Sequence, residues 1–232
     1  MRALQLASSL GATLSRFALG LSVGNPGKRP DQLLEVYEFE NCPFCRKVRE
    51  ALSILDLDAR IWPCPKNGPR YRPELIERGG KAQFPYLVDP NTGVEMYESD
   101  AIVRYLFETY GDGQVPLMLR RGPHNDFTTS MAALARPTSL GRFYREANPP
   151  HRELELYSFE ASPFCRLVRE MLTTLEIPYV LRNVAKGSSK REAFVALSGK
   201  MQVPFLVDAN TGAEMFESAD IVDYLQRTYA AR

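Results

Sequence analysis

The sequence predicts an α/β protein with two tandem copies of one small domain, each a four-stranded mixed sheet with flanking helices. Segment 34–52 recurs at 154–172, and segment 83–110 recurs at 202–229 with 18 of 28 positions identical. Along each copy, strand-like alternation and helix-like apolar spacing follow one another. The composition is 44% apolar and 25% charged, which is ordinary for a globular protein and excludes a disordered chain.

The repeats divide the 232 residues into four parts. Residues 1–32 form an N-terminal amphipathic helix and linker, 33–112 the first domain, 113–152 a connector and 153–232 the second domain. A domain of about 80 residues buries only a modest core. We therefore expect the two copies to pack together or against their flanking segments.

The elements of the first copy are expected in a fixed order: a strand over 34–39, a helix from 43, a strand over 59–62, a helix over 73–78, strands over 85–88 and 94–97, and a helix from 99. Pro43 suits a first helical turn because no N–H is needed there. Gly79 and Gly80 end the short helix, and the turn at 91–93 makes a hairpin.

The second copy repeats this order at 154–159, 163–175, 179–184, 191–197, 204–207, 213–216 and 218–229. In each copy, strand–helix–strand implies a right-handed parallel pair, to which the hairpin adds antiparallel strands.

The first 30 residues carry four basic side chains and no acidic one. One helical face of this segment is apolar, formed by Leu6, Leu10, Leu14, Phe17 and Leu21. A helix of the fold, an organelle transit peptide and a helix on a membrane surface all fit this pattern. We expect a cytoplasmic protein, with a plastid or membrane-associated location, including membrane-surface contact through residues 1–24, as the alternative.

Composition excludes several classes of function. The 29 basic and 28 acidic residues give a net charge of +1, which argues against nucleic-acid binding by bulk charge. No apolar stretch is long enough to span a membrane. Both histidines, His124 and His151, lie in the connector, and with four cysteines they do not suit a multi-ligand zinc site, so we expect no metal. Four cysteines in this length fit a reducing compartment.

The candidate chemistry lies in Cys42-Pro43-Phe44-Cys45, which follows the first strand. Cys42 stands at the start of a helix, where unpaired N–H groups and the helix dipole stabilise a thiolate. Cys45 lies three positions on, within reach of Cys42, and could resolve a mixed disulfide. The alternatives for this pair are two inert packed thiols and a metal or iron–sulfur role.

The second copy reads Ser162-Pro163-Phe164-Cys165, so a hydroxyl replaces the first thiol. Serine forms no disulfide. Ser162 and Cys165 therefore mark either a second site, where the hydroxyl donates a hydrogen bond to a bound thiolate, or a scaffold without chemistry.

These motifs resemble those of glutaredoxins and of the N-terminal domain of glutathione S-transferases. Among these, they resemble especially the cysteine-type (omega-like) transferases and the membrane prostaglandin E synthase type 2 domain. The resemblance rests on Cys-Pro-Phe-Cys, on Gln83-Phe84-Pro85 and on Glu98-Ser99, all at matching distances and repeated in the second copy. It covers about two-thirds of the chain and implies two tandem thioredoxin-like domains.

The resemblance implies a glutathione site in each copy. Pro85 and Pro204 would be cis prolines, and the main chain of Phe84 and Val203 would pair with the cysteinyl part of glutathione. The γ-glutamyl end would be held by two pairs, Glu98 with Ser99 and Glu217 with Ser218. A plain helix cap is the alternative reading of these pairs. Lys66, Arg70 and Arg72 could meet the glycine carboxylate, or form a solvated loop.

The chain departs from the transferase pattern in one respect. Transferases follow this domain with an all-helical domain that builds the second-substrate pocket, and we expect none here. The leading hypothesis is a glutathione-linked thiol–disulfide oxidoreductase that uses Cys42 and Cys45, with glutathione as co-substrate and a disulfide or thiol as partner. The alternatives are a glutathione S-transferase-type enzyme and a non-catalytic glutathione- or partner-binding scaffold.

Overall fold

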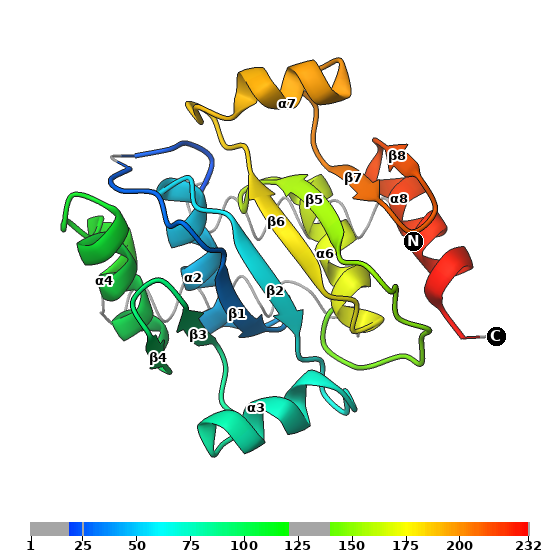
Figure 1. Cartoon of the computed structure of the whole chain (residues 1–232), viewed down its shortest axis with the longest axis horizontal. Helices are drawn as coiled ribbons and strands as arrows, with labels where there is room; N and C mark the ends of the chain where they lie inside the picture. Colours follow the sequence, from blue (N-terminus) through cyan, green and yellow to red (C-terminus); the bar gives the residue numbers. More distant parts are fainter. Residues whose placement is uncertain (1–18, 25, 121–139, 232) are drawn as a thin grey trace.

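The computed structural model describes residues 19–24, 26–120 and 140–231 (Figure 1). Residues 1–18, which hold most of the predicted N-terminal helix, and His124 lie outside the described residues. No helix in the described part of the chain is both long and apolar enough to cross a membrane.

The first copy contains the predicted elements in the predicted order: β1 (Leu34–Glu38), α2 (Pro43–Ile54), β2 (Ala59–Pro63), α3 (Tyr71–Gly79), β3 (Tyr86–Asp89), β4 (Val94–Met96) and α4 (Ser99–Tyr110). A short 3-10 helix, η1 (Leu117–Leu119), follows in the connector. Helix α3 begins two residues before the predicted start at Pro73, because proline fits anywhere in a first turn, where N–H groups have no helical acceptor.

The second copy contains the same elements: β5 (Leu154–Ser158), α6 (Pro163–Thr174), β6 (Tyr179–Asn183), α7 (Arg191–Ser198), β7 (Phe205–Asp208), β8 (Ala213–Met215) and α8 (Ser218–Tyr229). Their ends differ from the predicted ends by about one residue, which is the usual uncertainty of helix and strand boundaries.

The two predicted four-stranded mixed sheets are present, and they join into one sheet of eight strands in the order β4-β3-β1-β2-β6-β5-β7-β8 (Figure 1). In each copy the first two strands are parallel and the hairpin strands antiparallel. The junction is the antiparallel pair β2–β6, in which Arg60 faces Val180. These two residues are equivalent in the repeat, so the copies are related by an approximate two-fold axis through this pair.

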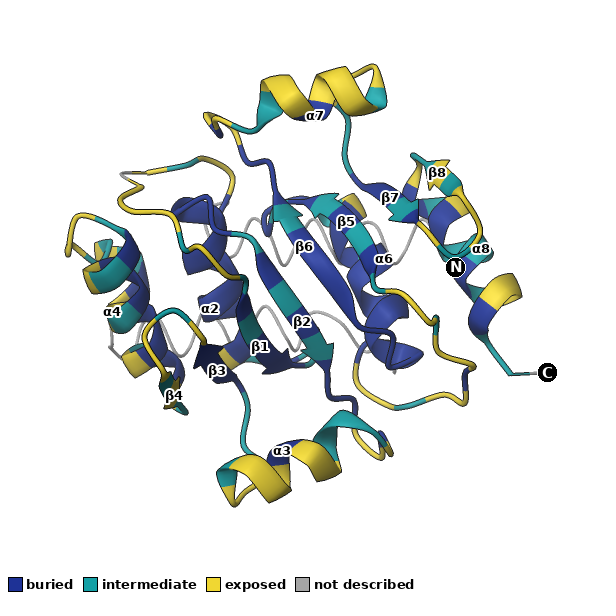
Figure 2. Cartoon of the chain, viewed as in Figure 1, coloured by how far each residue is buried: buried dark blue, intermediate teal, exposed yellow. Residues whose placement is uncertain are grey.

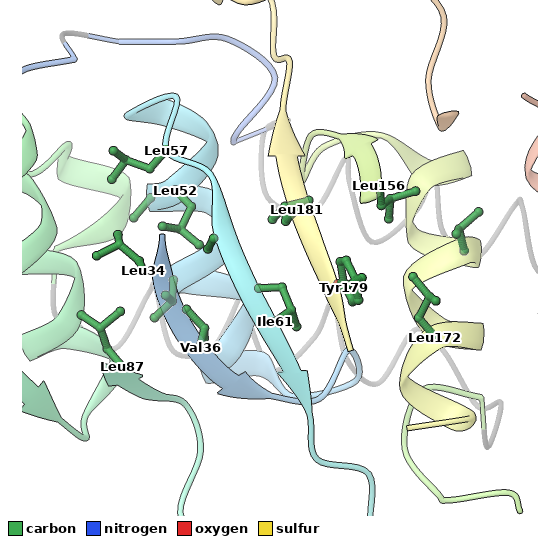
Figure 3. Packing of buried hydrophobic residues seen from close by; sticks show 14 of the residues in the cluster. Leu34, Val36, Leu52, Leu57, Ile61, Leu87, Leu156, Leu172, Tyr179 and Leu181 are labelled. Carbon is green, nitrogen blue, oxygen red and sulfur yellow. The ribbon is translucent and has the colours of Figure 1, made fainter. Parts of the chain in front are cut away.

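The main core lies between the sheet and helices α2, α4, α6 and α8 and runs through both copies. Figure 3 shows it continuing from Leu87 through Ile61 and Leu181 to Leu156. Smaller apolar clusters pack Leu75 of α3 and Phe194 of α7 against the other face of the sheet. Helices α3 and α7 expose most of their outer surface, whereas α2 and α6 are almost wholly buried (Figure 2). Each small copy therefore completes its core against the other, as expected.

Candidate functional site

Cys42 is the residue immediately before helix α2 and caps its N-terminus. Its backbone is extended (φ −87°, ψ 121°), and its Sγ accepts a hydrogen bond from the N–H of Cys45 at 3.3 Å. Pro43 occupies the first helical position, as the sequence predicts. The sulfur thus lies where the free N–H groups of the helix converge, which favours a thiolate.

The pKa of Cys42 is lower than that of an ordinary thiol. Burial by itself raises it, but hydrogen bonds from the thiol and N–H of Cys45, the charge of Arg49 and the N–H of Phe44 together outweigh burial. Arg49 lies on the same helix and is 1% exposed, so its charge is poorly screened by water. A larger fraction of Cys42 than of a free cysteine is therefore ionised at neutral pH.

Cys45 has the opposite properties. It is fully buried, and its pKa is well above the ordinary value because of burial first and then its interaction with Cys42. Glu38 on β1 raises the pKa of Cys45 further. Of the two cysteines, Cys42 is the nucleophile that the geometry favours, while Cys45 is held as a thiol that donates to it.

A pocket of about 470 Å³ opens beside Cys42. It is lined by Phe39, Cys42, Pro43, Phe44, Ala82, Gln83, Phe84, Glu98 and Ser99. The structure therefore brings four of the residues assigned to this site from sequence into one cavity, namely Cys42, Phe84, Glu98 and Ser99. The Phe84–Pro85 peptide bond is cis, as the resemblance implies.

Glu98 and Ser99 form the turn into α4. Glu98 has a positive φ of 71°, a conformation that a non-glycine residue adopts only at a cost in energy and that is concentrated at functional sites. Its side chain makes no capping hydrogen bond, and its Oε1 accepts from Nε2 of Gln83 at 2.5 Å. Glu98 is thus the N-cap residue of α4 by position, but its carboxylate does not bond to the helix and instead lines the pocket.

The second copy reproduces this geometry without the outer thiol. Ser162 caps α6, and its Oγ accepts from the N–H of Cys165 at 3.2 Å. Glu217 has a φ of 65° and accepts from Gln202, Ser218 begins α8, and the Val203–Pro204 bond is cis. The pKa of Cys165 is raised by burial, against hydrogen bonds with the hydroxyls of Ser158 and Ser162. The second copy therefore has the equivalent groups in the same arrangement, but its one cysteine in this motif, Cys165, is fully buried.

Lys66, Arg70 and Arg72, which from sequence could either meet the glycine carboxylate or form a solvated loop, lie in three different places. Arg72 lies behind the pocket: its guanidinium is 4.6 Å from the ring centre of Phe84, and its Nε donates to the carbonyl oxygens of Cys64 and Pro65. Lys66 lies over a connector ring, that of Phe143. Arg70 donates to the carbonyl oxygens of Glu176 in the second copy and of Ala147 in the connector. Only Arg72 is placed to influence the pocket.

Two aromatic side chains form part of the pocket wall. Phe44 is 48% exposed and forms a wall of the pocket, since it follows Pro43 on the outer side of the first helical turn. Phe39 also lines the pocket. The role of Gln83, which orients Glu98, was missed from sequence, although Gln202 and Glu217 repeat the pair in the second copy.

Cys64 is fully buried and occupies the position of Val184 in the second copy, which agrees with a packed side chain. Within residues 19–24, 26–120 and 140–231 there is no group of three or more His, Cys, Asp or Glu side chains that could hold a metal ion.

Comparison with known proteins gives one family, and glutathione transferases are among the similar solved structures. The model of the family described as "Glutathione S-transferase, N-terminal domain" matches twice, at residues 36–114 and 156–232. No curated protein matches the chain.

One similar structure is the glutathione transferase BmGSTD1 of Bombyx mori, with 29% identity over 36% of this chain and 38% of that one and a TM-score of 0.33. The chain thus spans less than half of that relative. Another is the trimeric glutathione transferase TDR1 of Leishmania, with 14% identity over 86% of this chain and 69% of that one and a TM-score of 0.30. Because the two family matches account for more than half of the residues, the chain belongs to the glutathione S-transferase N-terminal domain family and carries two copies of that domain in tandem.

Proposed function

We propose that the protein is a glutathione-linked thiol–disulfide oxidoreductase in which Cys42 is the nucleophile. The observation that carries the proposal is the position of Cys42: its sulfur caps a helix in a pocket that also holds Phe84, Glu98 and Ser99. The first turn of α4 offers N–H groups to a carboxylate, and Glu98 can receive an ammonium group. Glutathione carries both groups at its γ-glutamyl end.

The reaction proceeds by three exchanges. The Cys42 thiolate attacks one sulfur of a substrate disulfide, so that a Cys42–sulfur bond forms, the substrate S–S bond breaks, and the leaving thiolate takes a proton from water. The thiolate of one glutathione molecule then attacks the Cys42 sulfur of the mixed disulfide, so that a Cys42–glutathione disulfide forms and the second substrate thiolate leaves and takes a proton from water. A second glutathione thiolate attacks the glutathione sulfur of that disulfide, so that glutathione disulfide forms and the Cys42 thiolate is released. In total, one disulfide is reduced to two thiols while two glutathione thiols are oxidised to glutathione disulfide.

Glutathione, rather than Cys45, is proposed to resolve the mixed disulfide. Cys45 is fully buried and its pKa is raised well above the ordinary value, so that little of it is thiolate at neutral pH. A glutathione molecule in the pocket would present its own sulfur beside Cys42. The chemistry requires a reducing compartment, such as the cytoplasm, in which glutathione is kept mostly as the thiol.

The test is reduction of a small mixed disulfide with glutathione, coupled to glutathione reductase. We expect activity in the native protein, loss of more than about 100-fold in Cys42→Ser, and retention of most activity in Cys45→Ser. Cys165→Ser is the matched control, because it removes the equivalent buried thiol of the second copy. No activity in the native protein, or unchanged activity in Cys42→Ser, would refute the proposal.

A glutathione S-transferase-type activity is the second candidate, and the family membership of both copies favours it. In that case Cys42 or Ser162 would hold the glutathione thiolate by a hydrogen bond while it attacks an electrophile. Conjugation of a model electrophile that survives in Cys42→Ser would support this candidate. Binding of glutathione without turnover in either assay would leave a non-catalytic scaffold as the function.

A further inference from the structure

A group of buried charged residues joins the two copies beneath the helix that Cys42 caps. We call it the interdomain charge cluster, and it consists of Glu38, Glu40, Arg46, Arg49, Glu50, Glu160, Arg166, Arg169 and Glu170. Each member is at most 6% exposed. The cluster therefore lies where charges interact strongly and water screens them little.

In the cluster, each of two equivalent arginines forms an ion pair with a glutamate of the other copy. Nε of Arg49 lies 3.0 Å from Oε2 of Glu160, and Nε of Arg169 lies 3.0 Å from Oε2 of Glu40. Each glutamate also contacts the equivalent arginine of its own copy, at 3.3 Å for Arg49–Glu40 and 2.8 Å for Arg169–Glu160. The two copies thus share two arginines and two carboxylates as one unit.

The cluster reaches the active-site loop through Glu40, which precedes Cys42 by two residues. Its carboxylate is held by two arginines of the second copy, Arg169 and Arg166, the latter at 3.2 Å. Its carbonyl oxygen accepts from Nη2 of Arg49 at 3.2 Å. The next residue, Asn41, donates its N–H to the connector at Gly141, at 3.2 Å. The loop that presents the thiol is consequently fastened to groups outside its own domain.

The cluster also acts on Cys42 by charge, because Arg49 belongs to both. Arg49 is one of the groups that favour the Cys42 thiolate, and Glu160 of the second copy lies against it and offsets part of its charge. The other ionisable groups facing Cys42 are Cys45 on α2, Arg72 on α3 and Glu98 in the pocket wall. All of these belong to the first copy.

We propose that the second copy is a positioning domain for Cys42: Arg166 and Arg169 hold its loop through Glu40, and Glu160 shares Arg49, so that the reactivity of the thiol is set across the interface. The inference deepens the proposed function and rests on Cys42 being its reactive thiol. It assigns a task to a copy that lacks the outer cysteine. Arg166, Arg169 and Glu160 are positioning residues, since none of them touches the pocket.

The two kinds of charge predict opposite effects. Removing a positive charge in Arg169→Met disfavours the Cys42 thiolate and raises the pKa of Cys42. Removing a negative charge in Glu160→Gln leaves Arg49 and Arg169 less neutralised and lowers that pKa. A purely structural role would not produce changes of opposite sign, because loosening of the loop acts in one direction.

The experiment measures the rate of iodoacetamide alkylation of Cys42 against pH in the full chain, followed by mass spectrometry of the Cys42 peptide. At a pH below the wild-type pKa we expect the rate to fall about threefold in Arg169→Met and to rise about threefold in Glu160→Gln. Arg182→Met is the matched control: it also removes an arginine of the second copy, but one paired at the opposite face with Glu155. It should leave the rate unchanged.

Unchanged rates in both variants, or changes of the same sign, would overturn the inference. If Arg169→Met does not fold, Arg166→Met replaces it, because it removes another of the arginines on Glu40, and the same fall in rate is expected. Alkylation does not depend on turnover. Opposite changes in rate without any disulfide reduction would therefore uphold the inference and refute the proposed oxidoreductase, whereas full reduction with unaltered rates would do the reverse.

Discussion

Replacing Arg49 by methionine should destabilise the protein far more than replacing an exposed arginine. Arg49 is 1% exposed and contacts the carboxylates of Glu38, Glu40 and Glu160. Methionine fills a similar volume without charge. Glu40 and Glu160 keep Arg169 in the variant, so that the main loss falls on Glu38, a carboxylate left buried in the cluster.

Removing one partner of a buried ion pair costs about 3 to 5 kcal/mol. A domain of ordinary stability has about 5 to 15 kcal/mol, so the variant should still fold at 25 °C. The loss should be largest near pH 8 and smaller at pH 6. Burial raises the pKa of Glu38 to about 7, and at pH 6 most of the wild-type protein has already lost the Glu38–Arg49 attraction by protonation.

Urea denaturation followed by the fluorescence of Trp62, the single tryptophan, measures the free energy of unfolding. The ring of Trp62 lies 5.0 Å from that of Tyr71, within the first copy, so its emission reports on packing there. If the free energy of unfolding falls by about 2 to 3 kcal/mol per molar urea, the urea concentration at the midpoint of unfolding should be about 1 to 2 M lower in the variant. Arg78→Met is the matched control, since Arg78 pairs with Glu95 at the surface and should contribute at most about 1 kcal/mol. A loss in Arg49→Met no larger than that of the control would refute the reasoning.

Three further predictions follow from buried side chains. Burial raises the pKa of Glu38 from 4.5 to about 7, so its contribution to stability is full below pH 4.5 and is lost as the pH rises through 7. Glu38→Gln should therefore flatten the decline of the free energy of unfolding, measured by urea denaturation, between pH 5 and 8. A decline as steep as that of the wild type would contradict this prediction. Tyr110 donates a hydrogen bond to the buried carboxylate of Asp89 at 2.5 Å. Tyr110→Phe should lower the free energy of unfolding by about 1 to 3 kcal/mol and raise the pKa of Asp89, which NMR titration measures. No change in either quantity would contradict the role given to this hydrogen bond. Cys64→Val, which copies Val184, should change stability by less than about 1 kcal/mol and leave disulfide reduction intact, whereas a large loss of activity would give Cys64 a role that its burial does not indicate.

The repeat and the motifs were sufficient to predict each domain and most of the pocket. Strand and helix periodicity depends on neighbouring residues, and the distances from Cys42 to Phe84 and Glu98 are fixed by the fold of one copy. The joining of the sheets was not predictable in the same way. Within one copy, β2 is predicted only as the edge strand of its own sheet. Its pattern of apolar and polar residues does not predict that Arg60 pairs with Val180 of the other copy.

The charge cluster was also hidden from sequence reasoning. Arg46 and Arg49 stand among other charged residues on a helix, a pattern typical of a solvated face. Their burial depends on the second copy covering them, which is a long-range event. One regularity was nevertheless visible in the repeat: Glu40, Arg46 and Arg49 recur as Glu160, Arg166 and Arg169.

The register at the centre of the sheet disfavours pairing of the first copy with another molecule of itself through β2. If the first copy associated with another molecule of itself through the same strand, Arg60 would meet Arg60 across the two-fold axis, and like charges directly opposite each other oppose pairing. In the joined chain the residue opposite is Val180, and Nε of Arg60 lies 2.6 Å from Oε1 of Glu153, which the second copy supplies. The sheet therefore favours pairing of β2 with β6 over pairing of β2 with a second β2. In the joined sheet, the edge strands are β4 and β8, each three residues long, and such short edges offer few free backbone groups to other chains.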